Sequence, residues 1–288
     1  MFTKKLFKTA LAVSGLVCIA ATLVAFTAPG KKIKTANNRL PLSDSLAIST
    51  HAFNEDGLCI CLSHMPVADQ LEAPRIQLHR RAEGYVKDYI STNGFFLDKI
   101  KARSRSYFSM IDTVFTRFDL PVELKYLAVI ESNLQNKAVS GAGAAGIWQL
   151  MPVAAKSFGL KVGNGVDERM NTYKSTVAAA KCIRYLHRKF DDWLLTLAAY
   201  NSGPGRVYSA IKKSGSRDFW VLQSYLPEET RNHVKKFIAM HYYFEGHGSL
   251  ATLTKKETEA HVKAVNEYVK KRALPEADTL MAFVQTEE

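Results

Sequence analysis

The sequence predicts a mainly α protein. Apolar residues recur at helical spacing in most segments between Pro74 and Gly248, and glycine, asparagine and proline separate these segments. No hairpin signal and no sustained alternation of apolar and polar residues is expected to interrupt them. The chain of 288 residues is long enough to bury one sizeable core. We therefore expect one main helical domain over residues 74–248.

Residues 1–30 are typical of an export signal or an N-terminal membrane anchor. Lys4, Lys5 and Lys8 precede an apolar and small-residue run from Thr9 to Ala28, which is nearly long enough to span a bilayer. Cleavage and retention as an anchor both stay open. In either case we expect the rest of the chain to be exported to the periplasm or cell envelope, with membrane attachment if the segment is uncleaved.

Residues 31–73 are polar and lack periodicity, as in a linker or an irregular arm. Cys59 and Cys61 lie too close together in this segment for an unstrained disulfide, so a bond from one of them to Cys182 stays open.

Six segments of the main domain have helical spacing, and Pro121 suits the first turn of one of them. Asp191 or Asp192 is expected to cap the helix that begins at Trp193. The tail, residues 249–288, holds one charged helix over 255–273 and a frayed end. The six segments are 75–90, 95–118, 121–134, 175–190, 193–201 and 227–244.

Glu131 is the first candidate for chemistry. Leu124, Leu127 and Glu131 fall at i, i+3 and i+7, so they share one helix face. Burial disfavours the charged form of a carboxyl group, which would let Glu131 hold a proton near neutral pH and deliver it to a leaving group. The alternative is that the helix ends at Ser132 and Asn133 and that Glu131 points to water.

A glycine motif follows in "SGAGAAGIWQLMP", where Gly141, Gly143 and Gly146 form G-x-G-x-x-G and Asp167 stands at the distance of a ribose-binding acid. A dinucleotide site requires a buried strand before this motif, whereas the preceding "IESNLQNKAVS" is polar and broken. We therefore expect no nucleotide and no other cofactor. Glycines also let the backbone approach a bulky ligand closely.

Polar groups gather around the glycines and at the end of a later helix. Ser140 and Gln149 offer a hydroxyl and an amide beside the apolar Met151, and "LAAYNSGPGRV" ends a helix with Tyr200 and Asn201. Together with the glutamate they predict a cleft for an uncharged ligand rich in hydroxyl and amide groups. Trp148 serves either as an aromatic wall of this cleft or as a core residue.

Charge and metal-ligand patterns narrow the function further. The net charge of +12 favours contact with an anionic surface such as a membrane, a wall polymer or nucleic acid, although a soluble surface rich in lysine explains it equally well. No CxxC pair or HExxH motif occurs, and His241 and His247 are expected to form a helix-end cluster. We therefore expect no metal site.

The motifs "IESNL", "SGAGAAGIWQLMP", "LAAYNSGPGRV" and "LPEETRNHVKKFIA", in this order, resemble the SLT catalytic domain of family 1 lytic transglycosylases. The resemblance covers about residues 120–239 and is strongest to the membrane-bound D subgroup. Ile147-Trp148 stands where many relatives carry Leu-Met, a change that this subgroup shares. The resemblance implies a lysozyme-like α-helical transglycosylase domain, here with a helical N-terminal extension.

The resemblance also implies a substrate, peptidoglycan glycan strands, and a mechanism with one catalytic acid/base, Glu131. The enzyme would cleave the β-1,4 bond between N-acetylmuramic acid and N-acetylglucosamine and form a 1,6-anhydromuramoyl end. A lysozyme-like muramidase and a non-catalytic wall-binding protein on the same fold are the alternatives. No nucleic acid partner is expected. The residues that the resemblance places at the substrate are Ser140, Gln149, Met151, Tyr200, Asn201 and Glu229.

Overall fold

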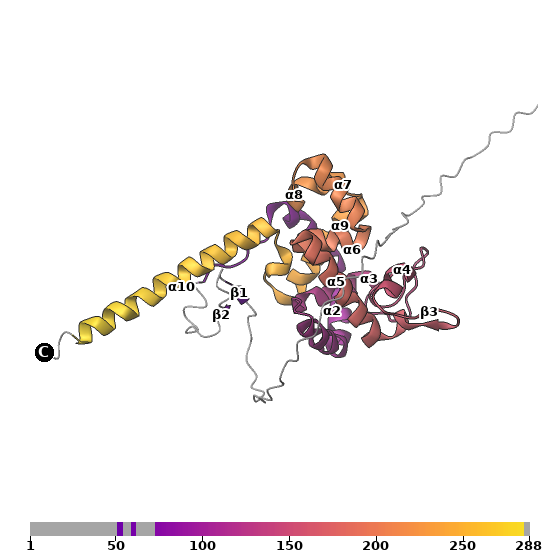
Figure 1. Cartoon of the computed structure of the whole chain (residues 1–288), viewed down its shortest axis with the longest axis horizontal. Helices are drawn as coiled ribbons and strands as arrows, with labels where there is room; N and C mark the ends of the chain where they lie inside the picture. The colour runs from indigo at the N-terminus through magenta and orange to yellow at the C-terminus, as the bar shows by residue number, and fades with distance from the viewer. Residues whose placement is uncertain (1–50, 54–58, 62–72, 285–288) are drawn as a thin grey trace, which may run out of the picture. The chain divides into compact units, whose positions relative to one another are not determined.

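The computed structural model describes residues 51–53, 59–61 and 73–284 (Figure 1). These residues fall into two compact units, one formed by residues 78–254 and the other by 51–53, 59–61, 73–77 and 255–284. Helices make up most of both units, so the mainly α prediction is confirmed. The predicted signal or anchor, residues 1–30, lies outside the described residues, and the predicted limits of the main domain stay predictions.

The first unit begins with one long helix, α2 (Arg80–Arg117). This helix precedes Pro121 and forms the predicted helical extension. The prediction of two helices, 75–90 and 95–118, is wrong at the break near Gly94. A glycine inside a helix costs only about 1 kcal/mol relative to alanine. Val86, Leu97 and Ile100 are buried on both sides of it, so their packing keeps the helix continuous.

The segment around Glu131 is a 3-10 turn, η2 (Val122–Lys125), that leads into a short helix, α3 (Tyr126–Ser132). Asn133 and Leu134 end α3 with left-handed backbones at φ 54° and 61°. Their amides donate to the carbonyls of Val129 and Ala128, which closes the last turn.

The remaining helices of this unit contain the predicted segments and add shorter ones. The carboxylate of Asp192 accepts from the amide of Leu195 at 2.9 Å and caps α6, whereas Asp191 ends the preceding helix at φ 51°. The elements are α4 (Pro152–Ser157), η3 (Glu168–Met170), α5 (Thr172–Phe190), α6 (Trp193–Ser202), α7 (Pro204–Ser214), α8 (Phe219–Leu222), η4 (Gln223–Tyr225), α9 (Glu228–Glu245) and η5 (Leu250–Thr252).

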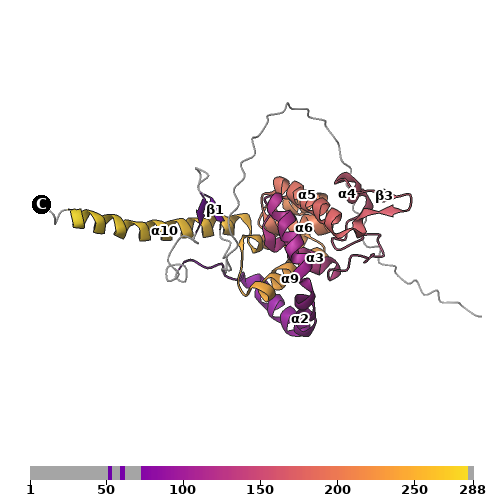
Figure 2. The same cartoon turned by 90° about the horizontal axis from the view of Figure 1, so that it is seen from below.

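A small hairpin interrupts the helices, contrary to the prediction. Strands β3 (Val162–Gly163) and β4 (Val166–Asp167) pair antiparallel across Asn164 and Gly165, and Figure 2 shows the hairpin beside α4. Asn164 and Gly165 both have positive φ, 51° and 76°. Asn-Gly is the preferred pair for such a two-residue turn, so the sequence contained the signal.

The core of the first unit lies between α2, α5, α6 and α9, with α3 against α9 (Figure 2). Trp148 is fully buried and its ring centroid lies 5.4 Å from that of Phe115. Of the two readings of Trp148, the core residue is therefore correct. Cys182 is also buried in this core as a free thiol.

In the second unit, strands β1 (His51–Phe53) and β2 (Cys59–Cys61) pair antiparallel within the segment that was expected to be an irregular arm. The helix α10 (Lys255–Val284) is longer than the predicted 255–273. Ala73 and Val265 are buried together in this unit. Among the helices that the structure describes, none combines the length and apolar character needed to cross a bilayer.

Candidate active site

Glu131 is largely buried near the end of α3. Leu124 and Leu127, which were expected to share its face, are fully buried, and the side chain of Glu131 is 14% exposed. The helix does end within two residues, as the alternative required, but the carboxyl group does not point freely to water. The sequence pattern allowed either a buried Glu131 or one that points to water, and the structure shows that it is largely buried.

The carboxyl group of Glu131 is paired with a histidine from another helix. Nε2 of His233, on α9, lies 2.9 Å from Oε1 of Glu131, and the His233 side chain is only 9% exposed. The two residues are more than a hundred positions apart in sequence, and the packing of α3 against α9 brings them together. A largely buried carboxyl group is thereby held on one side by an imidazole.

Two hydrogen bonds tie the loop after α3 to the helices around Glu131. The hydroxyl of Ser132, the neighbour of Glu131, donates to the carbonyl of Ile147 at 3.0 Å. The next carbonyl, that of Trp148, accepts from the hydroxyl of Tyr200 at 2.7 Å. The loop is therefore held between α3 and α6, and Tyr200 is held against the loop.

Two further bonds close a cycle. Thr230 on α9 donates to the amide oxygen of Asn201 on α6 at 2.8 Å, and one turn later His233 reaches Glu131 on α3. The four bonds join α3, the loop, α6 and α9 in sequence and return to α3. We call this arrangement the four-bond cycle. It fixes the relative positions of Glu131, Tyr200 and Asn201, three of the predicted site residues.

Tyr200 lies in the last turn of α6, as predicted, and Gly203 follows as the helix cap at φ 85°. Burial, followed by the nearby negative charge of Glu131, raises the pKa of the Tyr200 hydroxyl well above its usual value. Tyr200 therefore stays protonated and acts as a hydrogen-bonding group.

The loop over residues 138–151 positions Ser140, Gln149 and Met151. The hydroxyl of Ser140 accepts from the amide of Ala144 at 3.0 Å and shapes an exposed turn. The amide nitrogen of Gln149 donates to the carbonyls of Ala138 and Gly146, at 3.2 and 2.8 Å, and so braces the loop. Met151 is half-buried and precedes α4 as its N-cap.

The glycine motif has a structural function within this loop. Among the described residues, the motif follows an isolated bridge at Val139 and does not open a helix, unlike a dinucleotide loop. Gly146 has φ 79°, and a β-carbon there would overlap the backbone carbonyl of Arg169. Asp167, once considered as a ribose ligand, instead pairs with the Arg169 guanidinium at 2.7 Å.

Glu229 is the predicted site residue with the least structural support. It lies exposed in the first turn of α9, outside the four-bond cycle. It does stand one helical turn before His233, so both project from the same side of α9.

Sequence reasoning missed His233 and Arg169. The guanidinium of Arg169 is buried and donates to the carbonyls of Gly143 and Leu150, at 2.7 and 2.9 Å. It thereby fixes the loop from inside. His233 stands four residues after the predicted Glu229, on the same helix face, and this spacing was the available signal. No local sequence pattern predicts the buried position of Arg169.

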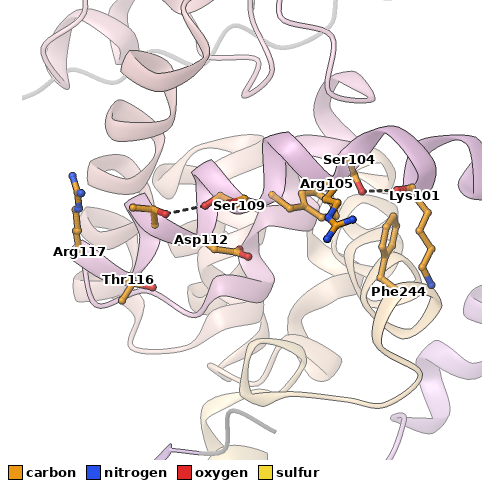
Figure 3. Close-up of a pocket in the computed structure, with 10 residues that line it drawn as sticks. Lys101, Ser104, Arg105, Ser109, Asp112, Thr116, Arg117 and Phe244 are labelled. Atoms are coloured by element: carbon orange, nitrogen blue, oxygen red, sulfur yellow. Dashed lines mark hydrogen bonds between the residues drawn. The ribbon is translucent and has the colours of Figure 1, made fainter. Parts of the chain in front are cut away.

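A cavity of about 870 Å³ lies elsewhere in the first unit, along the side of α2 and against Phe244 (Figure 3). Lys101, Arg105 and Arg117 give the cavity a mainly basic lining, and the carboxyl group of Asp112 also lines it. None of the predicted site residues lines this cavity. We place the candidate active site at Glu131 because the buried carboxyl group and its hydrogen bonds are there.

Comparison with known proteins gives four similarities. Residues 117–223 match the transglycosylase SLT domain family. Membrane-bound lytic murein transglycosylase D of Escherichia coli (strain K12) is 41% identical over 153 residues, which are 51% of this chain and 33% of that protein. The chain therefore aligns with only about a third of that relative's length.

Two more similarities were found. A putative tributyltin chloride resistance protein of Alteromonas sp. (strain M-1) is 39% identical over 124 residues, 41% of this chain and 60% of that protein. The crystal structure of the 70 kDa soluble lytic transglycosylase from Escherichia coli is 25% identical, with a TM-score of 0.42 over 50% of this chain and 26% of that one. The expected similarity to lytic transglycosylases is therefore confirmed, and it includes the match of residues 117–223 to the transglycosylase SLT domain family.

Proposed function

We propose that the protein is a peptidoglycan lytic transglycosylase with Glu131 as its catalytic acid/base. The substrate is the β-1,4 bond between N-acetylmuramic acid and N-acetylglucosamine, and the product carries a 1,6-anhydromuramoyl end. The observation that carries the proposal is the largely buried Glu131 carboxyl group, which the four-bond cycle holds beside Tyr200 and Asn201 within an SLT domain.

The mechanism uses one carboxyl group twice. Glu131 protonates the glycosidic oxygen while the acetamide of the substrate supports the positive anomeric carbon, as in substrate-assisted glycosidases. The resulting carboxylate then takes the proton of the muramoyl C6 hydroxyl, whose oxygen bonds to C1 and closes the anhydro ring. No water is consumed. Glu229, the other carboxyl group proposed for the site, is exposed and is assigned to substrate binding.

The other residues bind and position the sugar chain. The Tyr200 hydroxyl donates its hydrogen bond to the carbonyl of Trp148, so its oxygen remains free to accept from a sugar hydroxyl or amide. Likewise the amide nitrogen of Gln149 is used within the loop, and its carbonyl oxygen is the group assigned to the substrate. Ser140, Met151 and Asn201 complete the proposed binding surface.

The proposed location is the cell envelope, with the glycan strands of peptidoglycan as the partner. The apolar run within residues 1–30 supports export, and the basic net charge of +12 supports contact with an anionic envelope. The relative in Escherichia coli is named membrane-bound. Attachment of this chain through residues 1–30 is proposed for the case in which they are not cleaved.

The test is release of soluble muropeptides from purified peptidoglycan by the wild-type protein and by Glu131→Gln. The amide is similar in shape to the carboxyl group but has no acidic proton to give. General acid–base catalysis contributes about 10²–10⁴-fold, so the variant is expected to lose at least about a hundredfold in rate. Retention of more than about a tenth of the activity would reject Glu131 as the acid/base. Circular dichroism and thermal unfolding verify that the variant is folded.

A further inference from the structure

We propose that His233 is a positioning residue for Glu131: as the neutral Nε2–H tautomer it donates to Oε1 and leaves Oε2 as the oxygen that gives and takes the proton. The proposal rests on the proposed role of Glu131 as acid/base. It concerns a residue outside the predicted site.

The first support is the geometry of the pair. Nε2 of His233 lies 2.9 Å from Oε1 of Glu131, and both side chains are largely buried, at 9% and 14% exposure. A hydrogen bond to a charged group contributes more to stability than one between neutral groups. The packing of α3 on α9 holds the two residues, so the carboxyl group has little freedom to rotate.

The second support is the other ring nitrogen. Nδ1 of His233 is buried, and no hydrogen-bonding partner for it exists within the part of the chain that the structure describes. A proton on Nδ1 would therefore be a buried donor without an acceptor, which is unfavourable because its lost hydration is not replaced. Both the Nδ1–H tautomer and the doubly protonated imidazolium carry that proton. The surroundings thus favour the neutral ring with its proton on Nε2.

This tautomer assigns different tasks to the two oxygens of Glu131. Oε1 accepts from Nε2–H in both protonation states of the carboxyl group, so the acidic proton resides on Oε2. When Oε2 transfers that proton to the glycosidic oxygen, the bond between this oxygen and C1 breaks and the carboxylate remains. The Nε2–H donor stabilises the carboxylate. Oε2 then accepts the C6 hydroxyl proton as the C6 oxygen bonds to C1.

Other titratable or charged groups come from the elements packed around the pair. Tyr200 approaches Glu131 from α6, and burial keeps it protonated. From α2, Arg103 donates to the carbonyl of Asn133 at 2.6 Å, just beyond Glu131. On α9 itself, Glu229 is exposed and the ammonium of Lys236 lies 5.8 Å from the Tyr89 ring centroid. Glu131 is the described hydrogen-bonding partner of His233.

The test compares His233→Phe, His233→Gln and wild type in initial rates of muropeptide release from purified peptidoglycan across pH. Phenylalanine keeps a ring but removes the donor, so kcat is expected to fall about tenfold to a hundredfold with KM nearly unchanged. Glutamine offers an amide donor and is expected to restore most of kcat. His241→Phe, on the same helix and also buried, is the matched control with unchanged activity.

The pH profile separates positioning from a merely structural role. Loss of a donor to the carboxylate favours its protonated form, so the alkaline limb of kcat/KM moves to higher pH in His233→Phe and not in His233→Gln. Equal rates and equal profiles for His233→Phe and wild type would overturn the proposal. So would a loss in His233→Gln as large as that in His233→Phe.

A second measurement reads the tautomer in the wild-type chain and does not depend on activity. Nitrogen-15 spectra of histidine-labelled protein near pH 7 report the tautomer of each ring, and His233→Gln identifies the signals of His233. The Nε2–H tautomer is expected. An Nδ1–H tautomer or an imidazolium would overturn the proposal. Failure of the wild-type protein to release any muropeptide would instead reject the proposed function. The nitrogen-15 spectra would still decide whether His233 donates to Glu131.

Discussion

Tyr200 joins the loop to α6 through a single hydrogen bond, from its hydroxyl to the carbonyl of Trp148 at 2.7 Å. Tyr200→Phe keeps the ring and removes this bond, leaving one carbonyl without its donor, at a cost of about 1–3 kcal/mol in stability. We expect a folded domain with a lower unfolding temperature. If the bond also orients the reacting sugar, the rate falls by about tenfold, equivalent to about 1.4 kcal/mol in the transition state.

The measurement for Tyr200→Phe is thermal unfolding together with the rate of muropeptide release. The residual product is expected to keep its anhydro end, because ring closure needs only Glu131 and the C6 hydroxyl of the substrate. An unchanged rate would show that Tyr200 does not serve the chemistry.

We expect the buried His241 to make the stability of the protein depend on pH. It is fully buried on α9, and burial lowers the pKa of its imidazole from the usual 6.5 to about 4. Between these values the unfolded chain binds a proton that the folded chain does not. The free energy of unfolding therefore has its full value above pH 6.5, declines as pH falls toward 4, and is lower by roughly 3 kcal/mol below both values.

His241→Phe is expected to remove this contribution. Denaturant unfolding of wild type and variant at intervals from pH 7 to pH 4 measures the difference. The two free energies of unfolding should diverge with falling pH, in favour of the variant. If the two free energies of unfolding changed with pH in parallel, His241 would not be a buried neutral histidine with a lowered pKa.

The three glycines in the loop over residues 138–151 differ in how much room and backbone freedom the structure leaves for a side chain. A β-carbon at Gly146 would overlap the Arg169 carbonyl and would meet a backbone with φ 79°. At Gly143 space is open and only the positive φ of 84° opposes a side chain, at about 1–2 kcal/mol. At Gly141 the structure places nothing within 4 Å and requires no positive φ.

We therefore expect alanine substitutions at these three positions to lower stability and activity by different amounts. Gly146→Ala is expected to lower both the unfolding temperature and muropeptide release most, Gly143→Ala less, and Gly141→Ala little. Thermal unfolding in the presence and absence of NAD or ATP completes the test. Equal losses at all three positions, or stabilisation by a nucleotide, would contradict the structural role of the motif.

Elements with a strong local signal were predicted well from the sequence. The helix over 193–201 begins at its predicted cap Asp192 and ends at Gly203, because a carboxylate acceptor and a glycine with positive φ act locally. The break expected near Gly94 is absent because buried neighbours outweigh the local cost of glycine. The hairpin at Asn164-Gly165 was missed although its turn signal is local.

The site depends on contacts that no local pattern contains. Periodicity placed Glu131 on an apolar face but left its exposure open, because the answer depends on α9 packing against α3. His233 reaches Glu131 from a helix far away in sequence, and the buried Arg169 fixes the loop through two carbonyls. Such pairs join segments far apart in sequence, so they became visible only with the fold.

At the scale of the whole first unit, the four-bond cycle explains how separate helices hold one reactive group. Each bond involves a proposed site residue or a neighbour of one: Ser132 donates to Ile147, Tyr200 to Trp148, and Thr230 to Asn201. His233 closes the cycle on Glu131. The central claim is that this one carboxyl group both breaks a glycosidic bond and closes an anhydro ring.

Mass spectrometry of the fragments that the full chain releases from purified peptidoglycan tests this claim most directly, with Glu131→Gln as the control. We expect 1,6-anhydromuramoyl ends, about 18 Da lighter than reducing ends, since no water is added when the substrate assists its own cleavage. Mainly reducing ends would show a lysozyme-like hydrolase, and no soluble fragments at all would show a wall-binding protein; either result would rule out a transglycosylase that uses Glu131 as both acid and base.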